Sequence, residues 1–514
     1  MTRRETRWVL IYSLILAAIT SLPYIFAALS QDNEWSFTGF LFAVEDGNSY
    51  IAKMLSGSEG AWLFRSPYST MDQSGVLAFL PHILLGKLSG GSHGHLVVLY
   101  HLFRVMAIPP LVIAVYRFSA VFVDNVALRR WTVIIATVGG GLGWLLILLG
   151  QPVVAGSLPL EFYSPETFGF LAIYGLPHLT LARAAMLIGF IWYLQDEKGW
   201  RSGFILLLAG LIHSPELLSA FAALAAHQVA VLGFGAGKAD WVKRFGRAVL
   251  PSVPLMAYLG YAALTDPYLQ AWAAQNLILS PPLILYLLAF GLLLPAAYLG
   301  ARSLLRRLQE AMLFPIAWAI AIPALAWAPI NIQRRLPEGG WVALAVLAAA
   351  GLATLEGRSR RIGRVALASF LIPSSLLILA SGFELAMNPR EPAFRPLEEV
   401  EAFSLLGQLA EPSGVVLASF ETSNPLPAWA PVRVVAGHGP ETAGLADLQP
   451  RLDSFYRRST TDSDRMALVE EEQIEYLLYG PRERALGDWN PRDWTCLEFL
   501  ASQGDYDIFQ TCTP

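Results

Sequence analysis

Long apolar runs recur through residues 1–385 of this chain, and they constrain its fold more than any other feature. A helix needs about 20 mostly apolar residues to cross the hydrocarbon core of a bilayer. Peptide groups inside that core must be hydrogen-bonded within the protein, so runs of this length predict membrane-spanning helices. Only 15% of the residues are charged, whereas an average soluble protein has about 25%. We therefore expect an α-helical polytopic membrane protein.

Two of the candidate spans are irregular. The segment 168–195 contains Gly175-Leu176-Pro177-His178, and because proline removes a helical hydrogen bond we expect a kinked or re-entrant helix there. The run 203–213 is too short to cross a full bilayer alone. The candidate spans are 8–29, 96–119, 131–150, 168–195, 203–213, 216–235, 248–265, 280–299, 311–328, 340–355 and 362–385.

Clusters of Lys and Arg set the orientation, since short loops rich in these residues stay on the cytoplasmic side. All of the clusters fall on one side only if 203–235 crosses twice, with a turn at 213–216. We therefore expect about 11 spans in the cell (inner) membrane, a cytoplasmic N-terminus and an extracytoplasmic C-terminal domain. The clusters are Arg3/Arg4/Arg7, Arg129/Arg130, Lys198/Arg201, Lys243/Arg244/Arg247, Arg302/Arg306/Arg307 and Arg358/Arg360/Arg361/Arg364.

Residues 386–514 regain a polar composition, which predicts a soluble α/β domain after the transmembrane domain 1–385. Within it, His438 and Glu441 belong to the loop Gly437-His438-Gly439-Pro440-Glu441-Thr442, which follows a predicted strand. Ligands bind at the carboxyl ends of strands in open α/β sheets, so these two residues are candidates for lining a site; a plain structural loop is the alternative. Strand patterns lie at 415–420, 433–436, 474–479 and 507–509, and helical patterns at 397–410, 465–473 and 492–503.

The chain has two cysteines, Cys496 and Cys512, and both fall in this domain. Their proximity in a chain otherwise free of cysteine indicates a disulfide, which would place the domain in an oxidising compartment. Two unrelated thiols are the alternative.

An acidic pair, Glu45-Asp46, lies in the first outer loop, 30–95, within the stretch V-E-D-G-N-S-Y. Adjacent carboxylates repel each other, so one of them titrates upward unless a metal or another cation is present. The pair is therefore either a chemical site, with Mg or Mn as its divalent metal, or an ordinary solvated turn.

Arginines supply candidates for binding phosphate. Arg334 and Arg335 stand at the end of a span on the outer face, which the charge rule does not predict, and a guanidinium fork suits phosphate. A snorkelling pair that touches ordinary headgroups is the alternative. Arg104 is a second candidate, for which the alternative is an interfacial anchor.

Four further polar residues are candidates for lining a site, because polar groups at membrane depth are costly and tend to mark a pathway or site. Glu166 and His178 flank the irregular segment 168–195, and His213 and Glu216 flank the tight turn after 203–213. A structural histidine and a helix cap at Glu216 are the alternatives.

Several classes of function are excluded by what the sequence lacks. No basic block indicates nucleic acid, and there is no Gly-rich phosphate loop and no CxxC or HExxH spacing.

The layout resembles the GT-C superfamily of membrane glycosyltransferases: a first span, a long outer loop with an acidic pair, many spans with short inner loops, and an outer soluble domain. The stretches V-E-D-G-N-S-Y, N-I-Q-R-R-L-P-E-G, G-H-G-P-E-T and Y-G-P-R-E-R are similar to a group of bacterial GT-C-like proteins. The resemblance implies a sugar donor on polyprenyl phosphate, a lipid, glycan or protein acceptor, and Glu45-Asp46 as the catalytic dyad or metal site. The chain lacks a W-W-D-type motif, so we do not expect transfer of a large glycan to Asn.

Two other functions fit a polytopic membrane protein. One is a lipid or polysaccharide transporter or flippase, although the sequence shows no internal repeat and no matching pair of broken helices. The other is a non-catalytic membrane scaffold, in which the acidic pair would be inert.

Overall fold

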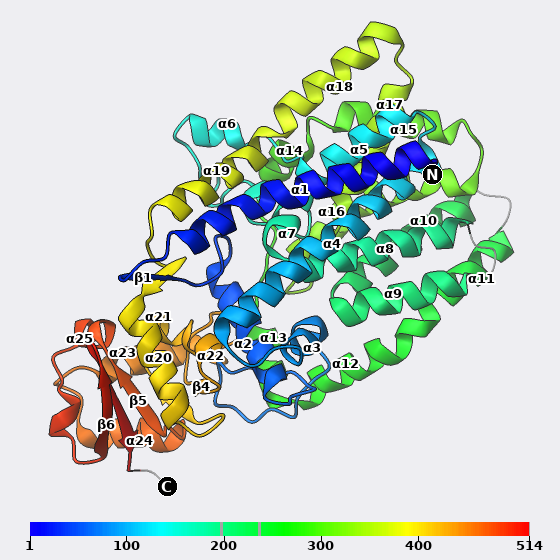
Figure 1. The fold of residues 1–514 in the computed structure, drawn as a ribbon. Coiled ribbons are helices and arrows are strands. Elements are labelled where there is room, and N and C mark those ends of the chain that lie inside the picture. Colours follow the sequence, from blue (N-terminus) through cyan, green and yellow to red (C-terminus); the bar gives the residue numbers. More distant parts are fainter. Residues whose placement is uncertain (196–198, 235–237, 513–514) are drawn as a thin grey trace. The chain divides into compact units, whose positions relative to one another are not determined.

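The computed structural model describes residues 1–195, 199–234 and 238–512 (Figure 1), so Lys198 of the predicted basic clusters lies outside the described residues. The chain divides into two compact units. The helical unit comprises Met1–Leu22, Leu102–Tyr258 and Leu277–Ser381, and the loop–tail unit comprises Pro23–His101, Leu259–Asn276 and Gly382–Pro514. The predicted division into 1–385 and 386–514 rests on composition and stays a prediction.

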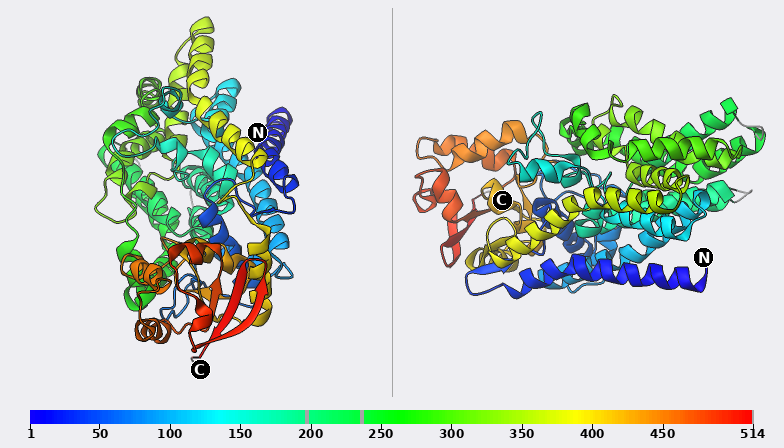
Figure 2. Two further views of the ribbon diagram at one scale, coloured as in Figure 1. Left: turned by 90° about the vertical axis from the view of Figure 1, so that its left-hand side faces the viewer. Right: turned by 90° about the horizontal axis from the view of Figure 1, so that it is seen from above.

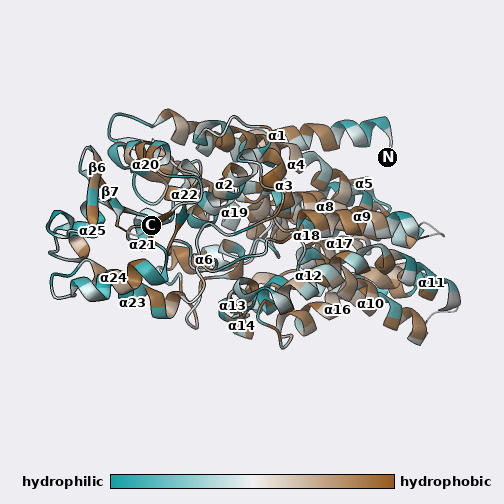
Figure 3. Cartoon of the chain, turned by 90° about the horizontal axis from the view of Figure 1, so that it is seen from below, coloured by the Kyte–Doolittle hydropathy of each residue, from teal (hydrophilic) through white to brown (hydrophobic). Residues whose placement is uncertain are grey.

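Apolar helices build the helical unit, and most of them are hydrophobic along much of their length (Figure 3). Four helices have residues in both units: α1 (Arg3–Leu29), α4 (His93–Phe122), α12 (Val253–Thr265) and α19 (Pro373–Met387). The others are α5 (Val126–Val138), α6 (Gly143–Leu148), α7 (Gly169–Gly175), α8 (Pro177–Gln195), α9 (Trp200–Ile212), α10 (Glu216–Phe234), α11 (Lys238–Val249), α14 (Leu283–Phe290), α15 (Leu294–Leu305), α16 (Phe314–Ala326), α17 (Gly340–Ala353) and α18 (Gly357–Leu371), with short 3-10 turns η1 (Leu160–Phe162), η2 (Leu250–Ser252), η3 (Glu310–Leu313) and η4 (Gln333–Arg335).

Helix α17 is the buried centre of this unit and packs against α15, α5 and α16. Glycines make its closest approach to α15. A Cβ atom on Gly300 would lie 1.9 Å from the carbonyl oxygen of Leu347, and one on Gly351 would lie 1.9 Å from that of Ala296. Small residues let membrane helices pack backbone against backbone, so these positions accept nothing larger than glycine.

The helices agree with a polytopic membrane protein. Within the described residues, 7 are long and apolar enough to cross a membrane, or up to 8 if α14 and α15, bent by 72°, form one span. The predicted break near Pro177 is confirmed, since α7 ends at Gly175 and α8 begins at Pro177. The expected span 131–150 is interrupted between α5 and α6, because the backbone N–H of Gly140 donates to the carbonyl of Leu371 instead of continuing a helix.

The loop–tail unit joins the first outer loop to the C-terminal domain. Strand β1 (Trp35–Phe37) pairs antiparallel with β2 (Phe394–Pro396). Helices α2 (Val44–Ser58), α3 (Leu80–Gly86) and α13 (Pro267–Gln275) belong to the same unit. Its other helices are α20 (Leu397–Leu409), α21 (Phe420–Ser423), α22 (Leu426–Trp429), α23 (Leu445–Phe455), α24 (Asp462–Glu471), α25 (Pro481–Leu486) and the turn η5 (Pro491–Asp493).

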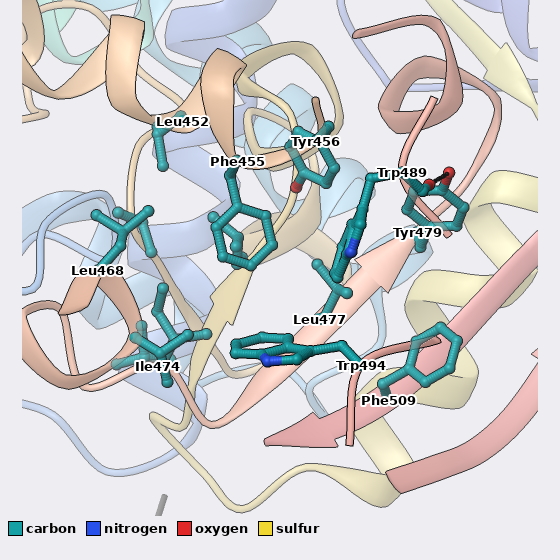
Figure 4. Packing of buried hydrophobic residues seen from close by; sticks show 14 of the residues in the cluster. Leu452, Phe455, Tyr456, Leu468, Ile474, Leu477, Tyr479, Trp489, Trp494 and Phe509 are labelled. Atoms are coloured by element: carbon teal, nitrogen blue, oxygen red, sulfur yellow. Dashed lines mark hydrogen bonds between the residues drawn. The ribbon is translucent and has the colours of Figure 1, made fainter. Parts of the chain in front are cut away.

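The C-terminal domain contains a five-stranded sheet of order β4-β3-β5-β7-β6. Strands β4 (Arg433–Val434), β3 (Val415–Leu417) and β5 (Tyr476–Tyr479) are parallel, while β7 (Tyr506–Thr511) and β6 (Leu497–Gln503) form an antiparallel hairpin at one edge (Figure 2). Side chains alternate between two cores. Leu477 enters the aromatic-rich core drawn in Figure 4, with Phe455, Trp489 and Trp494, whereas Leu478 enters the core that holds Ala52 of α2.

The helix predicted at 492–503 is wrong, because most of this segment is strand β6. Gly504 has a positive φ of 52° and supplies the tight turn that folds β6 back onto β7. Pairing with that neighbouring strand overrides the local helical pattern. The predicted disulfide between Cys496 and Cys512 is present and joins the outer ends of the same hairpin.

Close packing of α2 on α3 gives a test of the loop–tail unit. A Cβ on Gly86 would lie 1.8 Å from the carbonyl oxygen of Met54, which is backbone and cannot turn away. We expect Gly86→Ala to lower the free energy of unfolding by about 1–3 kcal/mol, as overpacking does. The control is Gly94→Ala, because a Cβ there meets no atom within 4 Å. Unfolding of detergent-solubilised protein measures both, and equal stability would contradict the packing.

Candidate functional site

The acidic pair opens helix α2. Ala43 precedes the helix with a positive φ of 48°, and Glu45 and Asp46 occupy the first turn. Acids are favoured there by the helix dipole. The side chain of Asp46 is 49% exposed and Glu45 is exposed, so both carboxylates are accessible. The pair is therefore part of a helix and not of a solvated turn.

The residues after the pair fix this helix within the loop–tail unit. A Cβ on Gly47 would lie 2.3 Å from the ring of Phe40, so the helix packs against that ring only with glycine. The side-chain amide of Asn48 donates to Oδ1 of Asn424 at 2.8 Å. The stretch V-E-D-G-N-S-Y thus serves both to bury one face of α2 and to expose its first turn.

A buried ion pair lies two turns further along the helix. Lys53 Nζ is 2.6 Å from Glu441 Oε1, and the two side chains are 1% and 5% exposed. The hydroxyl of Ser49 donates to Glu441 Oε1 at 2.6 Å, and that of Ser66 donates to Oε2 at 3.0 Å. Burial opposes ionisation of Glu441, but the charges of Lys53 and His438 and these hydrogen bonds lower its pKa to about 2.

His438 links this ion pair to the acidic pair. Its Nε2 lies 3.2 Å from Asp46 Oδ1, and its Nδ1 lies 3.5 Å from Glu441 Oε1. The hydroxyl of Thr442 accepts hydrogen bonds from the backbone N–H groups of Gly437 and His438, which holds the loop. Lys53, Glu441, His438 and Asp46 therefore form a charge chain that runs from the buried interior to a half-exposed carboxylate.

Three of the predicted site residues, Asp46, His438 and Glu441, thus meet although they are almost 400 residues apart. Lys53 was not predicted. A signal for it exists, since Asp46, Ser49 and Lys53 have the spacing i, i+3, i+7 and share one helix face. A lysine on the buried side of a helix needs a carboxylate partner, which Glu441 supplies.

The residues of the charge chain offer little to a divalent metal. Within the described parts of the chain, no group of three His, Cys, Asp or Glu residues is arranged to hold one. Glu441 is already bonded to Lys53. Mg²⁺ binds through one or two carboxylates and keeps several waters, so Glu45 and Asp46 are the donors left for it.

A second charged cluster lies in the helical unit. Arg183 Nε donates to Glu338 Oε1 at 2.5 Å, and both side chains are buried. Arg183 also donates to the carbonyl oxygens of Pro165 and Glu166 at 2.6 and 2.7 Å. The carboxylate of Glu166 pairs with Arg335 Nε at 3.2 Å. Arg183 and Glu338, which were not predicted, therefore tie the predicted residues Glu166 and Arg335 together.

The other predicted residues of this unit adjoin the same cluster. Glu216 is fully buried, and His213 Nδ1 lies 3.7 Å from its Oε2. The rings of His213 and His178 are 5.6 Å apart. Arg334 donates to the carbonyl of Tyr163 at 3.0 Å and lies over the ring of that residue. These contacts bring His178, His213 and Glu216 together, and their predicted role in lining a site stays a prediction.

Arg104 contacts another helix. It is buried, and its guanidinium donates to the hydroxyl of Thr20 at 3.2 Å and to that of Ser21 at 2.8 Å. These bonds join α4 to α1. These contacts give Arg104 a part in helix packing, and its predicted role in donor binding stays a prediction.

Comparison with known proteins identifies the fold. No family model matches the sequence, and no curated protein matches it. The oligosaccharyltransferase AglB from Archaeoglobus fulgidus matches in structure with a TM-score of 0.54 and 12% identity, over 93% of this chain and 70% of that one. ArnT from Cupriavidus metallidurans matches with a TM-score of 0.53 and 12% identity, over 98% of each chain. Both are GT-C glycosyltransferases, so the GT-C fold expected from the sequence is confirmed.

The buried ion pair predicts a strong effect of Lys53→Met. The substitution leaves Glu441 charged and buried without its cation, and breaking such a pair costs about 3–5 kcal/mol of unfolding free energy. The double variant Lys53→Met/Glu441→Gln removes both charges, and we expect it to regain part of that loss. Thermal unfolding in detergent measures both variants. Equal stability of Lys53→Met and wild type would show that the pair contributes nothing.

The same pair predicts a dependence on pH. The folded pKa of Glu441, about 2, lies below the ordinary value of 4.5. Its contribution to stability is therefore fully present above pH 4.5 and is lost as the pH falls from 4.5 toward 2. We expect Glu441→Gln to flatten the stability curve in this window, which unfolding at stepped pH measures.

Proposed function

We propose that this chain, which has the GT-C fold, is a glycosyltransferase that moves a sugar from a polyprenyl-phosphate donor to an acceptor on the outer face of the cell membrane. The observation that carries the proposal is the half-exposed Asp46 carboxylate, which His438 holds at the start of α2. The acceptor is a lipid, a glycan or a protein, and the N-terminus is cytoplasmic.

The proposed transfer reaction needs a general base and does not need a general acid. The acceptor's oxygen attacks the anomeric carbon, and the bond between that carbon and the phosphate oxygen breaks. Polyprenyl phosphate leaves as an anion, so its oxygen needs no proton. The acceptor's proton goes to Asp46, and a positioned base of this kind contributes about 10²–10⁴ to the rate. Glu45 stands beside it as a second carboxylate.

Arginine binds the donor's phosphate in this proposal. Arg335 is 34% exposed and already pairs with a carboxylate, that of Glu166, which supports an affinity for anions. Arg334 lies beside it in the turn η4 and stacks on Tyr163. A guanidinium presents two parallel N–H groups, and this geometry matches two oxygens of a phosphate.

The ligands of two similar structures fit such a donor. AglB was solved with a dolichol-phosphate, and ArnT was solved bound to undecaprenyl phosphate. For this chain we propose a lipid phosphate of the same class. As the alternative to a base, Glu45 and Asp46 would hold a divalent ion, Mg²⁺ or Mn²⁺, which would supply positive charge for the reaction.

Asp46→Asn tests the base. Purified protein receives undecaprenyl phosphate carrying radiolabelled glucose, mannose or arabinose, with isolated cell-envelope membranes as acceptor. We expect wild type to transfer label from at least one donor and Asp46→Asn to lose about 10²–10⁴ in rate. Glu59→Gln, at the other end of α2, is the matched control and keeps the rate. Equal rates in wild type and Asp46→Asn would contradict the proposal.

Arg335→Ala tests the phosphate site. Loss of a hydrogen bond to a charged group costs about 1.5–3 kcal/mol, so we expect KM for the donor to rise about tenfold to a hundredfold. Binding of undecaprenyl phosphate alone should weaken in parallel. Arg358→Ala, at an exposed arginine in the predicted cytoplasmic cluster, serves as control. An unchanged affinity in Arg335→Ala would exclude this residue from the donor site.

A further inference from the structure

We infer that His438 is the positioning residue for Asp46, so that the C-terminal domain supplies part of the catalytic machinery of the first loop. The inference rests on the proposed function, because it concerns how the base is held. It starts from the charge chain, in which His438 lies between the carboxylates of Glu441 and Asp46.

Both nitrogens of the His438 ring face carboxylate oxygens, at 3.2 Å to Asp46 and 3.5 Å to Glu441. A carboxylate accepts hydrogen bonds and donates none, so the ring nitrogen Nε2 bonds Asp46 Oδ1 as an N–H donor. His438 therefore holds the Asp46 carboxylate by a direct hydrogen bond.

Glu441 gives His438 a fixed support. Its carboxylate is bonded to Lys53, Ser49 and Ser66 at once, and it is buried. The backbone carbonyl of the same residue accepts a hydrogen bond from the hydroxyl of Tyr268 at 3.1 Å. A carboxylate with this many hydrogen bonds is held in one orientation. It therefore limits the orientation of the His438 ring beside it.

The consequence for Asp46 is a fixed rotamer. Oδ1 accepts a hydrogen bond from Nε2 of His438, and the carboxylate is half exposed, so the acceptor's proton is taken on the exposed side. The proton then leaves Asp46 to water, and no proton passes along the charge chain.

The titratable and charged groups around His438 come from three segments. Asp46 and Lys53 belong to α2, and Glu441 belongs to the histidine's own loop. The ring of Tyr68, from the loop before α3, lies 5.4 Å from the histidine ring. Burial and the nearby carboxylates of Glu441 and Asp46 raise the pKa of Tyr68, so it stays neutral beside His438.

Kinetics test the inference through the split between kcat and KM. With the undecaprenyl-phosphate donor that wild type uses, His438→Leu should lower kcat about a hundredfold, the cost of a misplaced group, and leave the donor's KM unchanged. His438→Gln retains a neutral N–H donor and should recover part of kcat. His95→Gln, an exposed histidine of the same unit, is the matched control.

A double variant separates positioning from general structural damage. If His438 acts through Asp46, then His438→Leu costs nothing further once Asp46→Asn is present, because effects within one unit are not additive. A full additional loss in the double variant would overturn the inference. So would an unchanged kcat in His438→Leu while Asp46→Asn is inactive, and this result would leave the proposed function intact.

A thiol reporter tests the same contact without any transfer reaction. Both native cysteines are in the disulfide, so Asp46→Cys introduces the sole thiol of the chain. Its alkylation by iodoacetamide is followed against pH. An N–H group of His438 that donates to the thiolate should lower the midpoint by about 1 pH unit or more relative to Asp46→Cys/His438→Leu. Equal midpoints would overturn the inference. A shifted midpoint in a protein that transfers no sugar would uphold it while the proposed function fails.

Discussion

The ion pair between Lys53 and Glu441 is the interaction on which the first of the two charged sites depends. Taking two charges out of water costs several kcal/mol for each ion, and their attraction offsets this only when the remaining lone pairs and protons are also bonded. Here two serine hydroxyls complete the carboxylate, and the rings of Phe79 and Phe64 lie 4.3 and 5.2 Å from the ammonium. The pair forms only after the first loop has packed on the C-terminal domain, so the site and the fold of this unit arise together.

This dependence explains how far the sequence alone leads. Apolar runs predict helices wherever the chain has them, and the position of His438 and Glu441 after a strand predicts that they reach the edge of a sheet. What joins them to Asp46 is the packing of α2 on that sheet, and no local pattern encodes it. The buried position of Lys53 cannot be predicted from the sequence for a related reason. On an amphipathic helix a lysine indicates the solvent side, and only the carboxylate that arrives from Glu441 makes it a buried residue.

The charged cluster in the helical unit obeys the same rule, that buried charges must be paired, in a more apolar environment. Arg183 lies in a helix that is otherwise apolar, and its charge is matched by Glu338 from a distant segment. A hydropathy average over the helix hides a single charged residue such as Arg183. The irregular segment around Glu166 and His178 can be recognised in the sequence, because it interrupts the apolar run. The residues found from the sequence are therefore those at breaks in helices. The two that were missed, Arg183 and Glu338, lie inside or beside a regular apolar run.

The two side chains proposed to act in the transfer each have a partner within their own unit. Asp46 pairs with His438, and Arg335 pairs with Glu166. In the proposed function, a lipid phosphate that binds Arg335 must compete with the Glu166 carboxylate, and the cost of displacing it is subtracted from the affinity for any anion. Asp46 does not face this competition, because His438 leaves one side of its half-exposed carboxylate open.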